Sequence, residues 1–251
     1  MTPAGALEVV GLTKMYGDLR AVSNLSFEVA PGEIVGMVGP NGAGKTTSLR
    51  SLAGIIPPTR GEIRICGHDL VGQPVAAKRQ LAFLPDEPRL FEYLTVREHL
   101  NFTARLYNVA DWEPRADALL AELELTDKRD KLPSELSRGM KQKLSIACGF
   151  LHSPKLVLLD EPLTGLDPLG IRKMKRSIAQ RAADGAAVLL SSHLLSLVEE
   201  LCHRVLVIAG GERVAFGSME EIRAQVGAAG AGTSLEDLFV QITAVNGGRG
   251  A

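Results

Sequence analysis

Hydrophobic residues change their spacing along this chain, and the changes predict its strands and helices. Residues 7–17 and 21–30 alternate loosely between apolar and polar positions, as strands do in a sheet with one exposed face. An apolar run at residues 34–39 follows the turn residues Pro-Gly-Glu at 31–33, and two more short strands are expected at residues 61–67 and 79–85. The first third of the chain is therefore predicted to be rich in strands.

The spacing becomes helical from about Thr95 to His152. Apolar residues recur every three or four positions in three successive segments, at residues 95–108, 113–125 and 140–152. We therefore expect a mainly helical insertion after the strand-rich segment.

The chain then alternates between strand and helix. Mainly apolar runs at residues 155–160, 186–192 and 204–210 are separated by helical patterns at residues 170–185 and 193–202. Apolar strands that alternate with helices are typical of a largely parallel sheet covered on both faces. This predicts the α/β class.

Four further segments complete the prediction. A helix is expected over residues 45–53, a strand over residues 212–217 and a final helix over residues 234–242, whereas the glycine-rich residues 246–251 are expected to be disordered.

Composition excludes several classes of protein. The net charge of -1 gives no electrostatic case for nucleic acid as a main partner. No run reaches about 18 apolar residues, and the first residues lack the pattern of a signal peptide. The three scattered cysteines favour small buried side chains over disulfides or a metal site. We expect a cytosolic protein that another chain would hold at any membrane where it works.

A glycine-rich loop predicts nucleotide binding. The stretch GPNGAGKT fits the pattern G-x-x-x-x-G-K-[ST] and lies between a predicted strand and a predicted helix. Its backbone N–H groups and the helix start suit phosphate oxygens, its lysine adds a full charge, and its threonine hydroxyl suits Mg²⁺. The predicted ATP-binding residues here are Gly39, Pro40, Asn41, Gly42, Ala43, Gly44, Lys45, Thr46 and Thr47.

A pair of acids ends the apolar strand LVLLDEP. Ligands of open α/β sheets bind at the carboxyl ends of the strands, where this pair lies. Asp160 is expected to hold Mg²⁺ together with Thr46, and Glu161 to act as general base toward a water molecule. The alternative is an ordinary strand followed by an acidic loop.

The stretch LSRGMKQK, residues 136–143, completes a set of motifs that resembles the ATP-binding subunit of an ABC (ATP-binding cassette) transporter. The resemblance covers nearly the whole chain, and the motifs occur in the family's order. It implies one P-loop ATPase domain, with a RecA-like core, an N-terminal antiparallel β subdomain and an inserted helical subdomain. The implied division is core at 7–87 and 153–226, helical subdomain at 88–152 and a C-terminal extension at 227–251.

The resemblance also implies further site residues. Tyr16 matches the aromatic residue that stacks on adenine, although an ordinary half-buried tyrosine fits its position as well. Ser137 and Gly139 match the family signature, usually Leu-Ser-Gly-Gly-Gln, and residues 164–167 match a loop that is more often Ser-Ala-Leu-Asp. His193 matches the histidine that contacts the γ-phosphate and helps to position the base, although a lone histidine is more often structural. The implied catalytic set is Glu161, His193 and Lys45.

The resemblance implies partners as well. Two such domains face each other head to tail, and the signature of one binds the γ-phosphate of the ATP that the other holds. The implied partners are a second ATP-binding subunit, identical or different, and an integral membrane permease that keeps the pair on the cytosolic face of the membrane. The implied activity is ATP hydrolysis with Mg²⁺, coupled to transport.

Two departures from the family pattern stand out. Arg138 and Met140 replace the usual Gly and Gln of the signature, and Asp86 follows Pro85 where the family usually has a Gln that touches Mg²⁺. We expect Asp86 to keep a metal-binding role. These variant forms resemble the exporter branch with separate permease chains, but the transported substrate stays open.

Two alternatives to a transport ATPase are weaker. A soluble ABC ATPase of DNA repair or translation usually has long coiled coils or two cassettes in one chain, and neither pattern is present. A regulatory subunit without turnover conflicts with the intact catalytic set.

Overall fold

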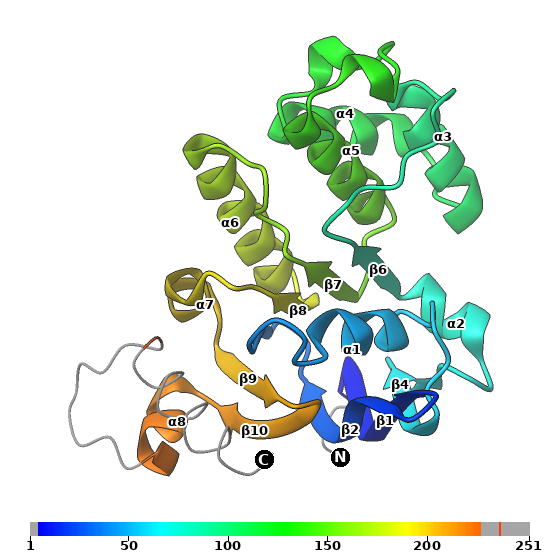
Figure 1. Cartoon of the computed structure of the whole chain (residues 1–251). Coiled ribbons are helices and arrows are strands. Elements are labelled where there is room, and N and C mark those ends of the chain that lie inside the picture. The colour runs from blue at the N-terminus through cyan, green and yellow to red at the C-terminus, as the bar shows by residue number, and fades with distance from the viewer. Residues whose placement is uncertain (1–4, 227–235, 237–251) are drawn as a thin grey trace.

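A six-stranded sheet runs through the centre of the molecule (Figure 1). The computed structural model describes residues 5–226 and residue 236. In spatial order the strands are β10 (Glu212–Gly217), β9 (Arg204–Ala209), β3 (Ile34–Val38), β8 (Ala187–Ser191), β7 (Leu156–Asp160) and β6 (Leu81–Leu84). The pairs from β9 to β6 are parallel, and only β10 in this sheet runs antiparallel to its neighbour.

A second sheet of four strands is antiparallel and lies beside the first. Its strands, in spatial order, are β2 (Leu19–Val29), β1 (Leu7–Tyr16), β4 (Arg60–Ile65) and β5 (His68–Asp69). Together the two sheets give the predicted combination of an antiparallel N-terminal part and a parallel core.

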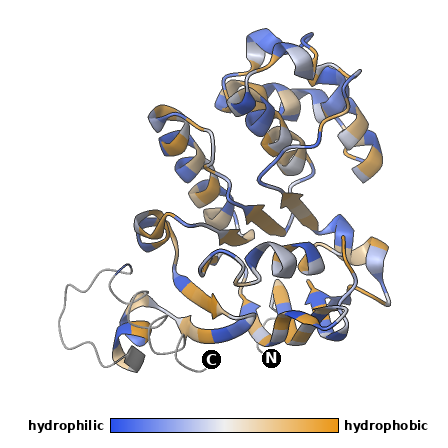
Figure 2. Cartoon of the chain, viewed as in Figure 1, coloured by the Kyte–Doolittle hydropathy of each residue, from blue (hydrophilic) through white to orange (hydrophobic). Residues whose placement is uncertain are grey.

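The strands of the parallel sheet form because their side chains are apolar on both faces. Every residue of β3, β7 and β8 is buried, and β7 appears orange in the hydropathy view (Figure 2). Such strands need helices on both faces to exclude water. The buried side chains form two clusters, one on each side of the sheet.

Outside the helical insertion, the described helices are α1 (Lys45–Leu52), α2 (Pro74–Arg79), α6 (Pro168–Ala183), α7 (Leu195–Leu201) and α8 (Met219–Val226). Helix α6 begins two residues before the predicted start, because Asp167 caps it and Pro168 occupies its first turn. Helices α2 and α8 were not predicted. Each has eight residues or fewer, too few for a clear apolar repeat.

The predicted helical insertion forms a lobe above the sheet (Figure 1). It contains α3 (Val96–Tyr107), α4 (Trp112–Glu122) and α5 (Arg138–Leu151), with two short 3₁₀ turns, η1 (Thr126–Lys128) and η2 (Pro133–Glu135), before α5. Helix α3 starts at a capping box in which Thr95 and Glu98 each bond the other's backbone N–H. Such a cap stabilises a helix by about 1 kcal/mol.

Three further predictions concern the C-terminus, the cysteines and membrane spans. The predicted final helix, except Glu236, and the glycine-rich C-terminus fall outside the described part. The three cysteines Cys66, Cys148 and Cys202 are free and only partly buried. None of the described helices has both the length and the apolar character needed to cross a bilayer.

Candidate active site

The loop between β3 and α1 has the backbone shape that phosphate binding requires. Gly42 and Gly44 adopt positive φ angles of 78° and 100°. A Cβ on Gly44 would lie 2.4 Å from the carbonyl oxygen of Ala21 on β2, so no other residue fits there. The sequence thus folds the loop tightly around the start of α1, where unpaired N–H groups favour an anion.

Lys45 turns back over this loop. Its Nζ donates to the carbonyl oxygens of Gly39, at 2.7 Å, and Pro40, at 3.2 Å. Burial lowers the pKa of Lys45, while Glu161 and Asp160 act in the opposite direction. The ammonium is therefore held at the mouth of the loop, beside two carboxylates.

Asp160, the last residue of β7, is almost fully buried. Its Oδ1 accepts a hydrogen bond from Ser191 Oγ at 2.7 Å and lies 3.3 Å from Thr46 Oγ1, which donates to it. Ser191 also accepts the backbone N–H of Glu161 at its Oγ, at 3.1 Å. The sequence analysis missed Ser191, because one serine at the end of an apolar strand forms no recognisable pattern.

Glu161 and His193 come from the ends of the neighbouring strands β7 and β8. His193 Nδ1 lies 2.8 Å from Glu161 Oε2, and the backbone N–H of His193 donates to the same oxygen at 3.3 Å. Glu161 has a φ of 49°. A non-glycine residue pays about 1–3 kcal/mol for such a conformation, and this strain is typical of functional sites.

Asp86 lines a cavity of about 260 Å³ together with Thr46 and Asp160. Asp86 Oδ1 is buried and makes no hydrogen bond, which is costly unless a ligand satisfies it. One hydroxyl and two carboxylates form the all-oxygen set that Mg²⁺ prefers. Within residues 5–226 and 236 the structure shows no group of three or more histidine, cysteine or acidic side chains that could hold a metal ion.

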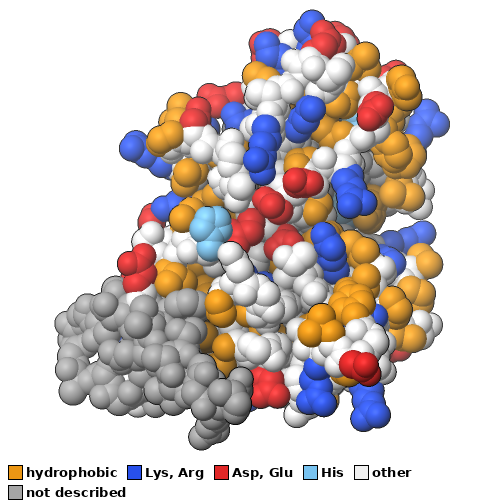
Figure 3. Space-filling view, viewed as in Figure 1, with side chains coloured by type: hydrophobic (Ala, Val, Ile, Leu, Met, Phe, Trp, Pro, Cys, Tyr) orange, Lys and Arg blue, Asp and Glu red, His pale blue; other side chains and the backbone are white. Residues whose placement is uncertain are grey.

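The remaining predicted residues lie apart from this centre. Tyr16, the last residue of β1, is 48% exposed, and Lys14 Nζ lies 5.0 Å from the centroid of its ring. Ser137 caps α5 by accepting the Met140 N–H at 3.3 Å. Met140 packs against the main apolar cluster, which accounts for a hydrophobic residue in place of the usual glutamine. Acidic side chains gather near the middle of the face in view, below the helical lobe (Figure 3).

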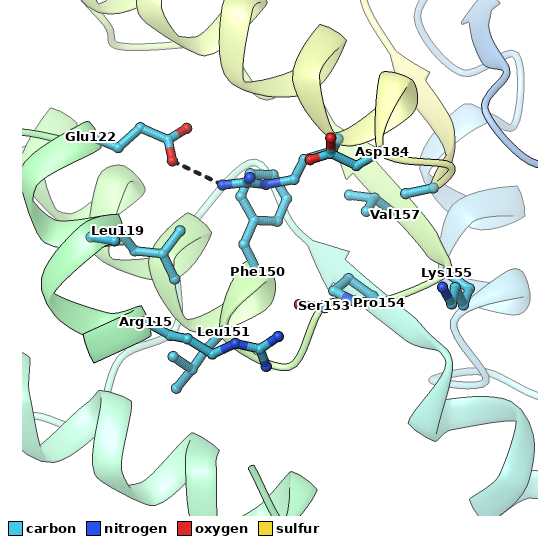
Figure 4. Close-up of a pocket in the computed structure, with 13 residues that line it drawn as sticks. Arg115, Leu119, Glu122, Phe150, Leu151, Ser153, Pro154, Lys155, Val157 and Asp184 are labelled. Carbon is cyan, nitrogen blue, oxygen red and sulfur yellow. Dashed lines mark hydrogen bonds and ion pairs between the residues drawn. The ribbon is translucent and has the colours of Figure 1, made fainter. Parts of the chain in front are cut away.

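A second cavity, of about 270 Å³, lies away from these residues, between the helical lobe and α6 (Figure 4). Glu122 of α4 crosses it: one oxygen accepts from Ser177 Oγ at 2.6 Å and the other from Arg181 at 2.9 Å. Arg181 also covers the Phe150 ring. These contacts tie the helical lobe to the core.

Comparisons with known proteins agree on one family. The model of the family described as ABC transporter matches residues 22–164. The chain is 36% identical to the ABC-type transporter ATP-binding protein EcsA of Bacillus subtilis, over 96% of this chain and 98% of the relative. It is 39% identical to the Nod factor export ATP-binding protein I of Paraburkholderia xenovorans, over 86% and 72% of the two chains. A solved structure titled as the ATP binding subunit of an ABC transporter superposes with a TM-score of 0.91 at 38% identity, covering 95% of this chain and 99% of that chain.

Proposed function

This chain belongs to the ABC transporter family as an ATP-binding subunit, and from that premise we propose how its own residues carry out the reaction. The chain binds ATP, hydrolyses it to ADP and phosphate, and couples hydrolysis to transport through a separate permease. The observation that carries the residue assignment is the meeting of Lys45, Asp160, Glu161 and His193 at one edge of the parallel sheet.

The nucleotide phosphates lie in the loop formed by residues 39–47, with Lys45 on the β- and γ-phosphates. Its ammonium leaves the loop carbonyls to do so, and the phosphate charge then favours the protonated amine that burial disfavours. Thr46, Asp160 and Asp86 would hold Mg²⁺, which would neutralise phosphate charge there. Tyr16 stacks on the adenine.

Glu161 is the general base. A water molecule attacks the γ-phosphorus, its proton passes to the Glu161 carboxylate, and the bond from the γ-phosphorus to the β–γ bridging oxygen breaks to release ADP. His193 holds Oε2 of Glu161, so that Oε1 is left to accept from the water. Ser191 Oγ accepts the backbone N–H of Glu161 and donates its own proton to Asp160, so that one hydroxyl orients both acids.

A second ATP-binding subunit completes the site. Ser137 and Gly139 open α5, whose unpaired N–H groups bind the γ-phosphate held by the other subunit. Either a second copy of this chain or a different cassette suits this arrangement. The proposed division of the chain stays as predicted: core at 7–87 and 153–226, helical subdomain at 88–152, extension at 227–251.

The permease docks on the helical lobe beside Asp86. Phe91, Tyr93, Phe102 and Leu106 are exposed there, with Phe91 and Phe102 in edge-to-face contact at 5.1 Å. Apolar side chains gather over α3 on the right of the face in view (Figure 3). Such a patch is typical of a protein interface. We place the subunit on the cytosolic side of the membrane and, from the export named for one relative, propose export as the direction.

The docking proposal is tested by co-purification with the membrane protein that accompanies the chain. Phe91→Ser combined with Phe102→Ser should lose that partner, because two polar side chains remove the centre of the patch. The control is Val10→Ser, which changes an exposed apolar residue on β1. Equal recovery of the permease with both variants would contradict the proposal.

A further inference from the structure

Arg138 lies against the loop that follows the catalytic glutamate. A Cβ placed on Gly165 would be 3.2 Å from Arg138 Nε and 3.3 Å from its Cδ, distances that few real Cβ atoms show. The stem of Arg138 therefore fills the space beside Gly165 where another residue would have its side chain. Within the described part of the chain, the Arg138 guanidinium makes no hydrogen bond or ion pair.

The contact pairs two departures from the family pattern. Arg138 stands where the signature usually has Gly, and Gly165 stands where the loop more often has Ala. The two residues are compatible with each other, because a side chain in place of Gly165 would occupy the same space as the stem of Arg138. Gly165 also has a φ of 80°, so alanine there meets backbone strain as well as crowding.

The contact extends along both segments. A Cβ on Gly139 would lie 3.3 Å from the Gly165 carbonyl oxygen and 3.8 Å from Leu166 Cδ2. The first turn of α5 and the loop of residues 164–167 are thus packed together over two successive residues.

This loop is short and connected to the base at one end. Thr164 N–H donates to the Glu161 carbonyl oxygen at 3.1 Å, and Leu166 N–H donates to that of Leu163. At its other end Asp167 caps α6 by accepting the Gly170 N–H at 2.6 Å. Because these hydrogen bonds hold both ends of the loop, a shift of the backbone at Gly165 is transmitted to Glu161, four residues away.

We infer that Arg138 is a positioning residue, whose aliphatic stem packs on Gly165 and holds the signature turn and the 164–167 loop as one unit, and so keeps Glu161 in place. The inference rests on the proposed role of Glu161 in hydrolysis. It assigns the effect to the stem of Arg138, and no contact of its charge with nucleotide is needed.

A double-mutant cycle tests this with the full-length chain, using ATP turnover as the readout. Arg138→Ala removes the stem without a loss of helix propensity and should lower kcat about threefold to tenfold. Gly165→Ala should lower kcat about tenfold or more. In the Arg138→Ala background the same change should cost at least about fivefold less, because the crowding is gone and only the backbone strain remains. The KM for ATP should stay within about twofold in all variants.

Two controls separate the stem from other effects. Arg138→Met keeps an unbranched apolar stem without charge and should retain kcat within about twofold of wild type. Gly185→Ala introduces alanine at another positive φ, of 95°, with open space around its Cβ, and should show no coupling to Arg138→Ala.

Three results would overturn the inference. One is simple multiplication of the effects at 138 and 165. Another is a loss of kcat in Arg138→Met equal to that in Arg138→Ala, or a raised KM for ATP. Either would mean that the charge of Arg138 acts on the nucleotide. The third is coupling in urea stability without coupling in kcat. In all three cases Glu161→Gln still reports separately on the proposed function, because its effect on turnover does not depend on residue 138.

Discussion

His193 contacts one carboxylate oxygen of Glu161 with two of its nitrogen atoms. Both the ring Nδ1 and the backbone N–H of His193 lie within hydrogen-bond distance of Glu161 Oε2, at 2.8 Å and 3.3 Å. The two residues follow β7 and β8, which are neighbours in the parallel sheet. His193, after β8, thus holds the base Glu161, after β7, and leaves the other carboxylate oxygen of Glu161 free for water.

His193→Ala is expected to lower kcat about a hundredfold, since the base loses the ring that orients it. His193→Asn should recover a substantial part, because its amide nitrogen can occupy the place of Nδ1. The measurement is steady-state ATP turnover with binding of ATP followed separately. Equal turnover in the Ala and Asn variants would show that this hydrogen bond does not act in the reaction.

Replacement of Asp86 should change the dependence on Mg²⁺. Its Oδ1 is buried without a partner beside Thr46 and Asp160, so its loss removes one oxygen ligand. Asp86→Ala is expected to raise the Mg²⁺ concentration at half-maximal turnover several-fold, and Asp86→Gln to raise it less, because the amide oxygen can still bind. Wild-type rate and wild-type Mg²⁺ dependence in both variants would exclude a metal role.

His99 makes the docking segment sensitive to pH. Its Nε2 accepts the Phe91 N–H at 3.0 Å, so the proton of the neutral ring is on Nδ1, which donates to the Thr95 carbonyl oxygen at 2.8 Å. Burial lowers the pKa of His99 below its usual 6.5, against the opposing effects of the Thr95 carbonyl and Glu98. The unfolded chain therefore binds the proton more readily than the folded chain.

The free energy of unfolding should accordingly fall as the pH drops below about 6.5 and level off once the folded state is protonated too. Urea unfolding of wild type and His99→Asn at several pH values measures this, since the other groups titrate alike in both. The stability difference between the two proteins should shrink toward acid pH. A difference that is constant with pH would contradict the assignment.

Local patterns were sufficient to predict the parallel sheet and the start of α1. The run ending at Asp160 is apolar on both faces, and such runs admit few structures other than a buried strand. The order of the motifs also placed Glu161 and His193 at strand ends, where the structure brings them together. Their catalytic roles stay predictions.

Other features depend on how distant segments pack, and sequence patterns carry no sign of them. Ser191 supports Asp160 only because β8 lies beside β7. The contact of Arg138 with Gly165 depends on how the helical lobe rests on the loop after Glu161. Met140 likewise gains its explanation from the apolar cluster that it meets.

The central claim is that Glu161 is the base for ATP hydrolysis, and Glu161→Gln tests it most directly. The variant keeps the shape of the side chain but cannot take a proton, so turnover should fall at least about a hundredfold while ATP binding is retained and ATP-bound dimers accumulate. Glu62→Gln, an exposed change on β4, is the matched control and should turn over as wild type does. Turnover by Glu161→Gln at the rate of this control would contradict the account.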